Sequence, residues 1–221
     1  MSKPGPEGSR REARIEASVF ALAACVLLLL LGVVSMAASW ELAGVSGWIW
    51  FVFAVPEVLL VGALALDAPP SVDVTMILVV VLANLGGLAL LIASLVTEDS
   101  SDLSGGQLLM SGAVLWLTNV IVFGLLYWSL DAGGPRARAK RGRRRPDFWF
   151  PQDDNDRLAH TGWHPRLEDY AYVALTNGIA FSPTDAMPLT RRAKTLMGLD
   201  ALISVGAVLL VAARAVNVLG A

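Results

Sequence analysis

The sequence predicts an all-α membrane protein with five transmembrane helices and a short re-entrant segment before the last of them. Two observations come from composition: 55% of the 221 residues are hydrophobic and only 16% are charged, whereas a soluble domain averages about 45–50% and about 25%. The third observation is that five apolar runs are long enough to cross a bilayer, which needs about 20 residues. Lipid is therefore the expected surroundings of most of this chain.

Four of the apolar runs come before residue 130, and a fifth lies near the C-terminal end. Their expected bounds are Ala17–Ser39, Ser46–Leu66, Val72–Val96, Leu108–Tyr127 and about Leu189–Leu219. The first run is longer than the roughly 7–15-residue core of a signal peptide and lacks a convincing cleavage site, so we expect a retained anchor. Cys25 is the only cysteine, and inside this run it is expected to pack as a small buried hydrophobe.

Basic residues divide the chain and predict its orientation. No lysine or arginine occurs from Ile15 to Pro135, but such residues cluster on both sides of that stretch. Short loops rich in Lys and Arg stay in the cytoplasm, so we expect a multi-pass protein of the bacterial plasma membrane with a cytoplasmic N-terminus. Four parts are expected in order, namely a polar basic tail, a four-helix region, a basic and aromatic cytoplasmic loop and a final segment: residues 1–16, 17–130, 131–166 and 167–221.

The loop after the fourth run is expected to contact the membrane surface. Its basic residues are followed closely by aromatic ones, and the expected lipid-contact residues are Arg136, Arg138, Lys140, Arg141, Arg143, Arg144, Arg145, Phe148, Trp149 and Phe150. Beside a membrane helix each basic residue gains about 1 kcal/mol from anionic headgroups, and aromatic rings favour the headgroup boundary. The expected partner is thus the lipid bilayer with its anionic headgroups, and not nucleic acid.

Two acidic residues fall inside apolar runs. Glu57 follows Pro56 near the middle of the second run, and Asp200 lies about 13 Å beyond the basic start of the last run. An ionised acid at such a depth is costly unless it is paired or reaches water, so residues of this kind are functional candidates. For both acids a hydrogen-bonded structural role and a role in a proton or ion pathway stay open.

A short helix, a broken segment and a long helix are expected in succession near the C-terminal end. Leu167–Asn177 has a helical composition over only about three turns, and Gly178 and Pro183 then interrupt it. This layout is typical of a re-entrant loop. The stretch resembles the pore region of potassium channels without a gap at Tyr172, Leu175, Thr176, Asp185, Pro188, Thr190, Ala193 and Lys194. It also resembles a bacterial family of multi-pass membrane proteins, without an assigned activity, that carries T-N-x-x-A-F-S-P-T-D-x-M-P-L.

The resemblance implies a pore-loop fold and a homo-oligomer, because one such loop cannot ring a pore alone. It does not extend to the glycines of the filter, since Ser182 and Thr184 stand at the two glycine positions and Pro183 at the tyrosine. Glycine takes positive φ easily, whereas proline fixes φ and lacks an amide hydrogen, so a potassium-selective filter is not expected. The pore-loop candidates are the residues here whose side chains offer oxygen atoms: Thr176, Asn177, Ser182, Thr184 and Asp185.

An ion-channel-like membrane protein that does not select potassium is the leading functional hypothesis. Two alternatives stay open: a non-conducting scaffold that binds anionic lipid or a protein partner, and a small proton-coupled carrier that uses Glu57 and Asp200. No nucleophile elbow, phosphate-binding loop or zinc-protease motif occurs in the sequence, so we expect neither an enzyme nor a cofactor. His160 and His164 flank Gly162, which disfavours a helical metal site, so no metal is expected.

Overall fold

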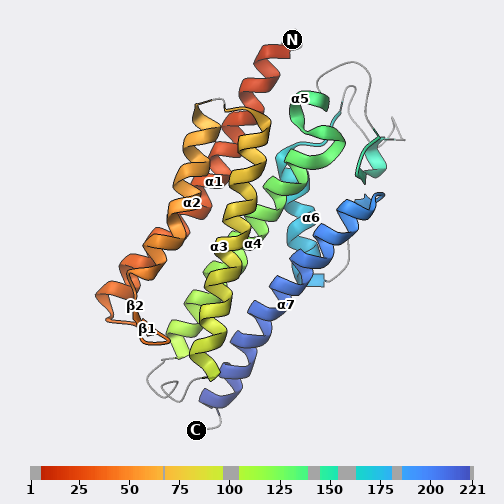
Figure 1. The fold of residues 1–221 in the computed structure, drawn as a ribbon. Helices are drawn as coiled ribbons and strands as arrows, with labels where there is room; N and C mark the ends of the chain where they lie inside the picture. Colours follow the sequence, from red (N-terminus) through yellow and green to blue (C-terminus); the bar gives the residue numbers. More distant parts are fainter. Residues whose placement is uncertain are drawn as a thin grey trace.

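The computed structural model describes residues 6–66, 68–96, 105–138, 145–153, 163–180 and 186–219, and the side chains at 6–10, 95–96, 105 and 210–219 are not described. The described chain forms an elongated bundle of helices that lie side by side (Figure 1). Helix α1 enters at one end of this bundle, and α7 runs toward the opposite end (Figure 1).

Helices account for most of the described residues, as the sequence predicts, so the all-α prediction is confirmed. They are α1 (Pro6–Ala37), α2 (Ile49–Ala65), α3 (Pro70–Val96), α4 (Gly105–Leu130), α5 (Pro135–Arg138), α6 (Leu167–Ala180) and α7 (Arg191–Leu219). Two single turns of 3-10 helix are η2 (Asp131–Gly133) and η3 (Pro151–Asp153). The first helix begins at Pro6 because the basic segment before the first apolar run is itself helical.

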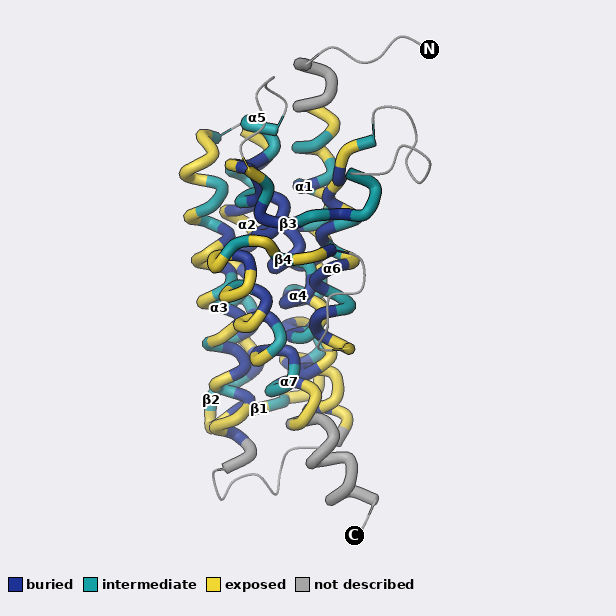
Figure 2. The backbone as a smooth tube through the Cα atoms, turned by 90° about the vertical axis from the view of Figure 1, so that its right-hand side faces the viewer, coloured by how far each residue is buried: buried dark blue, intermediate teal, exposed yellow. Residues whose placement is uncertain are grey.

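Helix α4 is the centre of the bundle. It packs against α1, α3, α6 and α7, and every residue from Val122 to Trp128 is buried. Its sequence explains this position, since the helix contains no charged residue and a helix that is hydrophobic all round belongs in the interior of a protein or a membrane. Buried stretches are seen along α4 where other helices cover it (Figure 2).

The outer face of the bundle is apolar, whereas several polar side chains lie inside. Large hydrophobic side chains of α1 are exposed at helical spacing, at Ile15, Val19, Leu22, Val26, Leu30 and Val33. Helices α2, α3 and α7 expose similar side chains, yet the carboxyl groups of Glu57 and Asp200 are fully buried. An apolar exterior over so many helices suits lipid surroundings, because water would disfavour an exposed apolar area of this size.

Three helical segments of the described chain are long and apolar enough to cross a membrane: Arg11–Ala37, Pro70–Ser94 and Gly106–Gly133. Helix α2 is also apolar but has 17 residues, which correspond to about 25 Å at 1.5 Å per residue. The structure is therefore compatible with a membrane protein, as the composition predicts.

Two pairs of short antiparallel strands lie at opposite ends of α4. Strands β1 (Glu41–Leu42) and β2 (Val45–Ser46) are joined by Ala43 and Gly44 at φ of 50° and 73°, the positive values that a type I′ turn needs. At the other end β3 (Phe148–Trp149) pairs with β4 (Met187–Pro188). The second pair connects the segment after α5 to the segment that leads into α7.

Candidate functional site

Helices α6 and α7 are consecutive in the chain but run in the same direction beside α4. Near the start of α6, the Tyr170 hydroxyl donates to Asp131 (2.6 Å), and near the start of α7, Arg192 donates to the carbonyl of Leu130 (2.9 Å). Toward the end of α6, Asn177 donates to the carbonyl of Met197 (2.8 Å), well inside α7. Helix α6 therefore ends part of the way along the bundle, and α7 begins again at the end of the bundle where α6 starts (Figure 1).

Asp200 lies at the point where α6 ends and forms the centre of a buried polar cluster. Its carboxylate accepts hydrogen bonds from Asn119 Nδ2 (3.0 Å), the Tyr127 hydroxyl (3.0 Å) and Asn177 Nδ2 (2.9 Å). Asn119 also donates to the Ser204 hydroxyl (3.2 Å). All five side chains are buried, and we call them the Asp200 cluster.

The donors of the Asp200 cluster match an ionised carboxylate. A carboxylate offers only acceptors, and amide N–H and phenol O–H groups donate to it. The donors are neutral, and within the described part of the chain no salt bridge is formed by Asp200, while the four salt bridges described involve other acids. A negative charge held by neutral donors away from water attracts a cation or a proton, which is why ionisable groups at such positions mark ion pathways.

Close packing of α6 against its neighbours gives the Asp200 cluster its geometry. A Cβ atom at Gly178 would lie 2.9 Å from the Ser204 hydroxyl, and a Cβ atom at Gly124 would lie 2.8 Å from the Ala171 Cα. Only glycine allows the backbones to approach so closely at these positions. The two glycines thus allow α6 to pack closely against α4 and α7. This packing places Asn177 at hydrogen-bonding distance from Asp200.

Glu57 is a second buried acid, on helix α2. Its side chain is 0% exposed, and neither carboxylate oxygen has a hydrogen-bond partner among the described protein groups. Asn84 on α3 is also buried, and its Nδ2 atom has no described acceptor, although its Oδ1 accepts from Thr118 (3.3 Å). Thr118 and Asn119 are adjacent on α4, and they donate hydrogen bonds to Asn84 and Asp200 respectively. A single turn of α4 therefore contacts both polar residues.

A second polar network holds the start of α6 at the basic end of the bundle. Asp131 Oδ1 accepts from the amides of Asp147 (2.6 Å) and Phe148 (3.2 Å), and Oδ2 accepts from Tyr170. The Arg138 guanidinium lies 4.0 Å from Asp131 Oδ2 and 5.4 Å from the centre of the Tyr170 ring. Burial raises the pKa of the Tyr170 phenol above its ordinary value, so the hydroxyl remains a donor.

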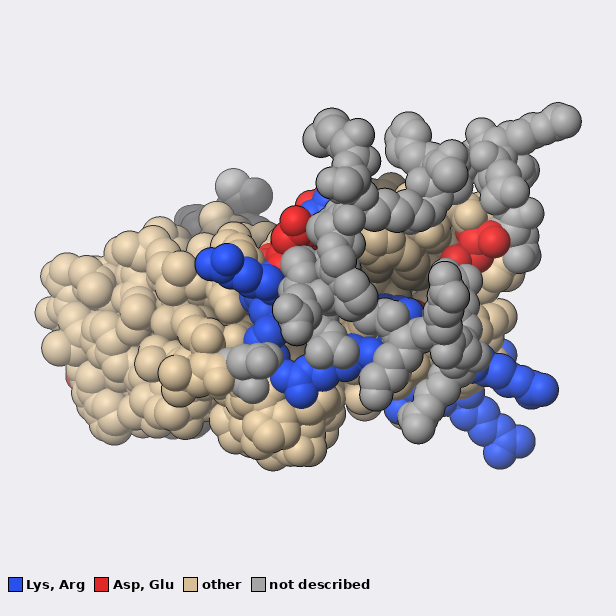
Figure 3. All heavy atoms as spheres, turned by 90° about the horizontal axis from the view of Figure 1, so that it is seen from above, with Lys and Arg blue, Asp and Glu red and all other residues tan. Residues whose placement is uncertain are grey.

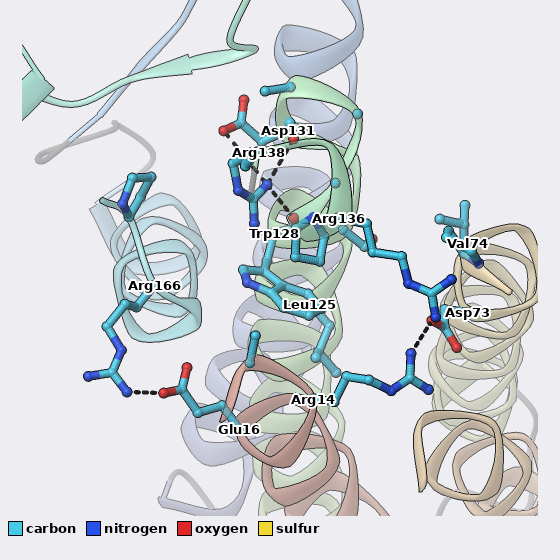
Figure 4. A pocket seen from close by; sticks show the side chains of 18 of the residues that line it. Arg14, Glu16, Asp73, Val74, Leu125, Trp128, Asp131, Arg136, Arg138 and Arg166 are labelled. Atoms are coloured by element: carbon cyan, nitrogen blue, oxygen red, sulfur yellow. Dashed lines mark hydrogen bonds and ion pairs between the residues drawn. The ribbon is translucent and has the colours of Figure 1, made fainter. Parts of the chain in front are cut away.

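The same end of the bundle contains a cavity of about 1120 Å³. Arg14 reaches across its wall to Asp73 (3.3 Å), and Arg166 pairs with Glu16 on the other side (Figure 4). The buried hydrophobic residues of the lining include Leu64, Ile77, Leu125 and Trp128. Lys and Arg side chains gather around this end of the molecule (Figure 3).

The structure places the pore-loop candidates in three groups: one belongs to the Asp200 cluster, one forms hydrogen bonds within α6, and three lie outside the described residues. Asn177 belongs to the cluster, whereas the Thr176 hydroxyl donates back to the carbonyls of Tyr172 (2.9 Å) and Val173 (3.2 Å). Ser182, Thr184 and Asp185 lie outside the described residues. The same holds for four of the expected lipid-contact residues, Lys140, Arg141, Arg143 and Arg144.

The aromatic residues expected at the headgroup boundary lie partly inside the protein. Phe148 is 2% exposed and Phe150 is 0% exposed, and both rings pack edge-to-face on Tyr170. Trp149 is partly exposed. Phe148 and Phe150 therefore do not make the expected contact with lipid. They lie two residues apart beside the β3–β4 pair, and both rings face the start of α6.

The arginines of this segment also have partners in the protein. Arg138 donates to the carbonyls of Trp128 (2.7 Å) and Asp131 (2.8 Å), and Arg136 donates to the carbonyl of Ala68 (3.2 Å). Arg145 is exposed. Arg138 therefore caps the C-terminal end of α4, where backbone carbonyls lack partners within the helix.

Several members of the two networks are absent from the sequence-based expectations. Tyr127, Asp131, Asp147 and Ser204 carry no motif, and only helical spacing, such as that of Asp200 and Ser204 on one face, indicates a shared site. Among the described residues no group of His, Cys, Asp and Glu has the arrangement of a metal site.

Comparisons with known proteins identify no relative. No family model matches the chain, and neither a curated protein nor a solved structure is significantly similar to it. The class that the fold and the buried clusters define is an all-α protein compatible with a membrane, with acids enclosed by its helices.

Proposed function

We propose that this protein is an ion-channel-like membrane protein that passes small monovalent cations or protons and does not select potassium. In this proposal α1–α4 and α7 cross the membrane, the N-terminus is cytoplasmic, and α6 is a re-entrant helix. The observation that carries the proposal is the Asp200 cluster, in which a buried carboxylate meets the end of a half-length helix.

The parallel course of α6 and α7 supports the re-entrant part of the proposal. With 14 residues, α6 is about 21 Å long at 1.5 Å per residue, which is too short to cross a bilayer of about 30 Å. Non-helical backbone at membrane depth is tolerated only where protein or water surrounds it. Helix α6 ends beside the Asp200 cluster, where polar partners are available.

The charge of the Asp200 cluster supports cations as the conducted species. Its acceptor is a carboxylate, and all of its donors are neutral, so an anion would be repelled. Ionisable side chains inside a membrane bundle are typical of ion and proton pathways, and Asp200 is enclosed within a single copy of the chain. The sequence lacks the glycines of a potassium filter, which favours weak discrimination among small cations.

Replacing Asp200 with asparagine is expected to lower cation flux at least about tenfold, the change that about 1.4 kcal/mol produces in a rate. Asparagine keeps the shape of aspartate but removes the charge that attracts the cation. Purified protein in lipid vesicles would be tested for proton, sodium and potassium flux driven by a gradient of each ion.

Glu41→Gln is the matched control, because it also converts an acid to its amide but at an exposed strand position. Its flux is expected to equal that of the unchanged protein, and size-exclusion chromatography would verify that both variants remain folded. Flux that is absent for all three ions, or equal in Asp200→Asn and the unchanged protein, contradicts the proposal. A complete absence of flux would instead favour the non-conducting scaffold.

A further inference from the structure

Glu57 is separate from the Asp200 cluster and remains without a role in the conduction proposal. It lies on α2, which contributes no side chain to the Asp200 cluster, and the other buried residues of α2 are hydrophobic: Trp50, Ala54, Leu60 and Leu64. Of these only Trp50 carries a polar atom, and its indole nitrogen also has no described hydrogen-bond partner. Both of its carboxylate oxygens are enclosed without a described hydrogen-bond partner.

The energy of ionisation decides the protonation state of such a group. Transferring an ionised carboxylate from water into an apolar interior costs tens of kcal/mol, so an isolated buried acid binds a proton instead. A neutral carboxyl without a partner costs only a few kcal/mol. Glu57 is therefore most stable as the neutral acid, and ionisation requires a cation or water to arrive beside it.

The groups facing Glu57 from the surrounding helices do not offer a cation. Cys25 on α1 is a buried titratable side chain, and Glu57 is the only charged residue of α2. The charged residues of α1 precede Ala17, and Arg14 among them donates to the carbonyls of Ala63 and Leu64 near the end of α2. On α3 the one charged residue is Asp73 in the first turn, and α4 has none. The hydroxyl group of Tyr127 on α4 donates its hydrogen bond to Asp200.

Asn84 is the polar group of α3 nearest to the level of Glu57. The rings of Trp50 and Phe53 on α2 contact Gly87 and Gly86 on α3, which fixes the register of these antiparallel helices. Counting forward along α2 and backward along α3 puts Asn84 within about one helical turn of the Glu57 level. Its unpartnered Nδ2 atom is a donor suited to a carboxyl oxygen.

The cavity at the basic end approaches Glu57 along α2. Its apolar lining includes Leu64 on α2 and Ile77 on α3. Leu64 is seven residues from Glu57 on the same helix, about 10 Å along its axis. Leu60 lies between them and is 1% exposed, and it belongs to the same buried core as Ile77 and Val80. Buried apolar side chains therefore separate the cavity from the acid.

We propose that Glu57 is a proton-binding site, which holds its carboxyl neutral between α1, α2 and α3 and exchanges the proton through the cavity at the basic end. The proposal is independent of conduction through Asp200, because the two acids lie on different helices and no described hydrogen bond joins Glu57 to the Asp200 cluster.

Dicyclohexylcarbodiimide is a suitable probe, since this apolar reagent reaches acids inside membranes and reacts with their protonated form. The carboxyl O–H adds across one C=N bond of the reagent, and the acyl group then moves to nitrogen. The product is an N-acylurea that retains every atom of both reactants. Mass spectrometry of peptides from the labelled protein locates the adduct.

In lipid vesicles we expect an adduct on Glu57 at neutral pH and a loss of labelling as the pH rises, because deprotonation removes the reactive form. Glu57→Gln should lose this adduct, while Asp200→Asn should retain it at the level of the unchanged protein. Protein unfolded in detergent at acidic pH serves as the control that the peptide can be labelled and detected. A folded protein that never labels Glu57 at any pH would overturn the proposal.

Infrared spectroscopy tests proton exchange separately from reactivity. The C=O stretch of a protonated carboxyl, assigned by its loss in Glu57→Gln, is expected to shift in heavy water and to disappear at high pH. A band that responds to neither change would show a sealed structural acid and would also overturn the proposal. Since neither readout measures ion flux, failure here and failure of the conduction proposal are distinguishable.

Discussion

Replacing Gly124 with alanine is expected to lower the free energy of unfolding by about 1–3 kcal/mol, the usual cost of overpacking. The added Cβ would lie 2.8 Å from the Ala171 Cα and 3.2 Å from the Ala171 amide nitrogen, so the clash is with backbone and no side chain can rotate away. Helix α6 would have to move off α4. Thermal unfolding of purified protein in detergent measures the change.

Gly62→Ala is the matched control for this prediction. Gly62 also lies inside a helix, but a Cβ atom there meets nothing within 4 Å. Alanine is about 1 kcal/mol better than glycine in a helix interior, so this variant should be neutral or more stable. If the two variants unfold alike, α6 does not pack on α4 as closely as described.

Replacing Asp131 with alanine is expected to cost about 3–5 kcal/mol, the range for removing one partner of a buried ion pair. The carboxylate is 2% exposed and accepts from the Asp147 amide, the Phe148 amide and Tyr170. Its loss would leave these three donors without their acceptor and would remove the carboxylate that lies 4.0 Å from the Arg138 guanidinium. Denaturant titration or thermal unfolding measures the effect.

Two further variants make this second prediction specific. Tyr170→Phe removes one of the donors and should cost about 1 kcal/mol, the net value of one hydrogen bond, and its effect should be smaller in the Asp131→Ala background. Glu168→Ala removes an exposed acid from the first turn of α6 and should change stability by less than about 1 kcal/mol. An Asp131→Ala variant no less stable than Glu168→Ala would contradict the network.

The succession of helices is predictable from the sequence because it depends on local composition. The third apolar run predicts a helix over Val72–Val96 and the helix is Pro70–Val96, while the short helix predicted at Leu167–Asn177 extends to Ala180. Apolar runs of this length and breaks at Gly and Pro are local signals. The same signals predict that α6 is too short to cross a bilayer.

The surroundings of individual polar and aromatic residues are not predictable in the same way. The sequence predicts lipid contact for Phe148 and Phe150, but both pack inside the protein, since β3 pairs with a strand about forty residues away. Asn177 lies in the motif that the sequence offers, but the motif does not reveal its partner, and Asn119 belongs to no motif. Both donate to Asp200 only because α6 and α7 run parallel beside α4. Such contacts depend on residues far apart in the chain.

Composition and spacing along the chain are enough to establish that this protein is helical, suited to lipid, and provided with two acids inside apolar segments. Packing in three dimensions then distinguishes the two acids, because Asp200 is enclosed by donors from α4 and α6 while Glu57 is enclosed without one. The physical reason is that the state of a buried charge depends on which distant groups reach it, and those groups are brought together only when the helices pack.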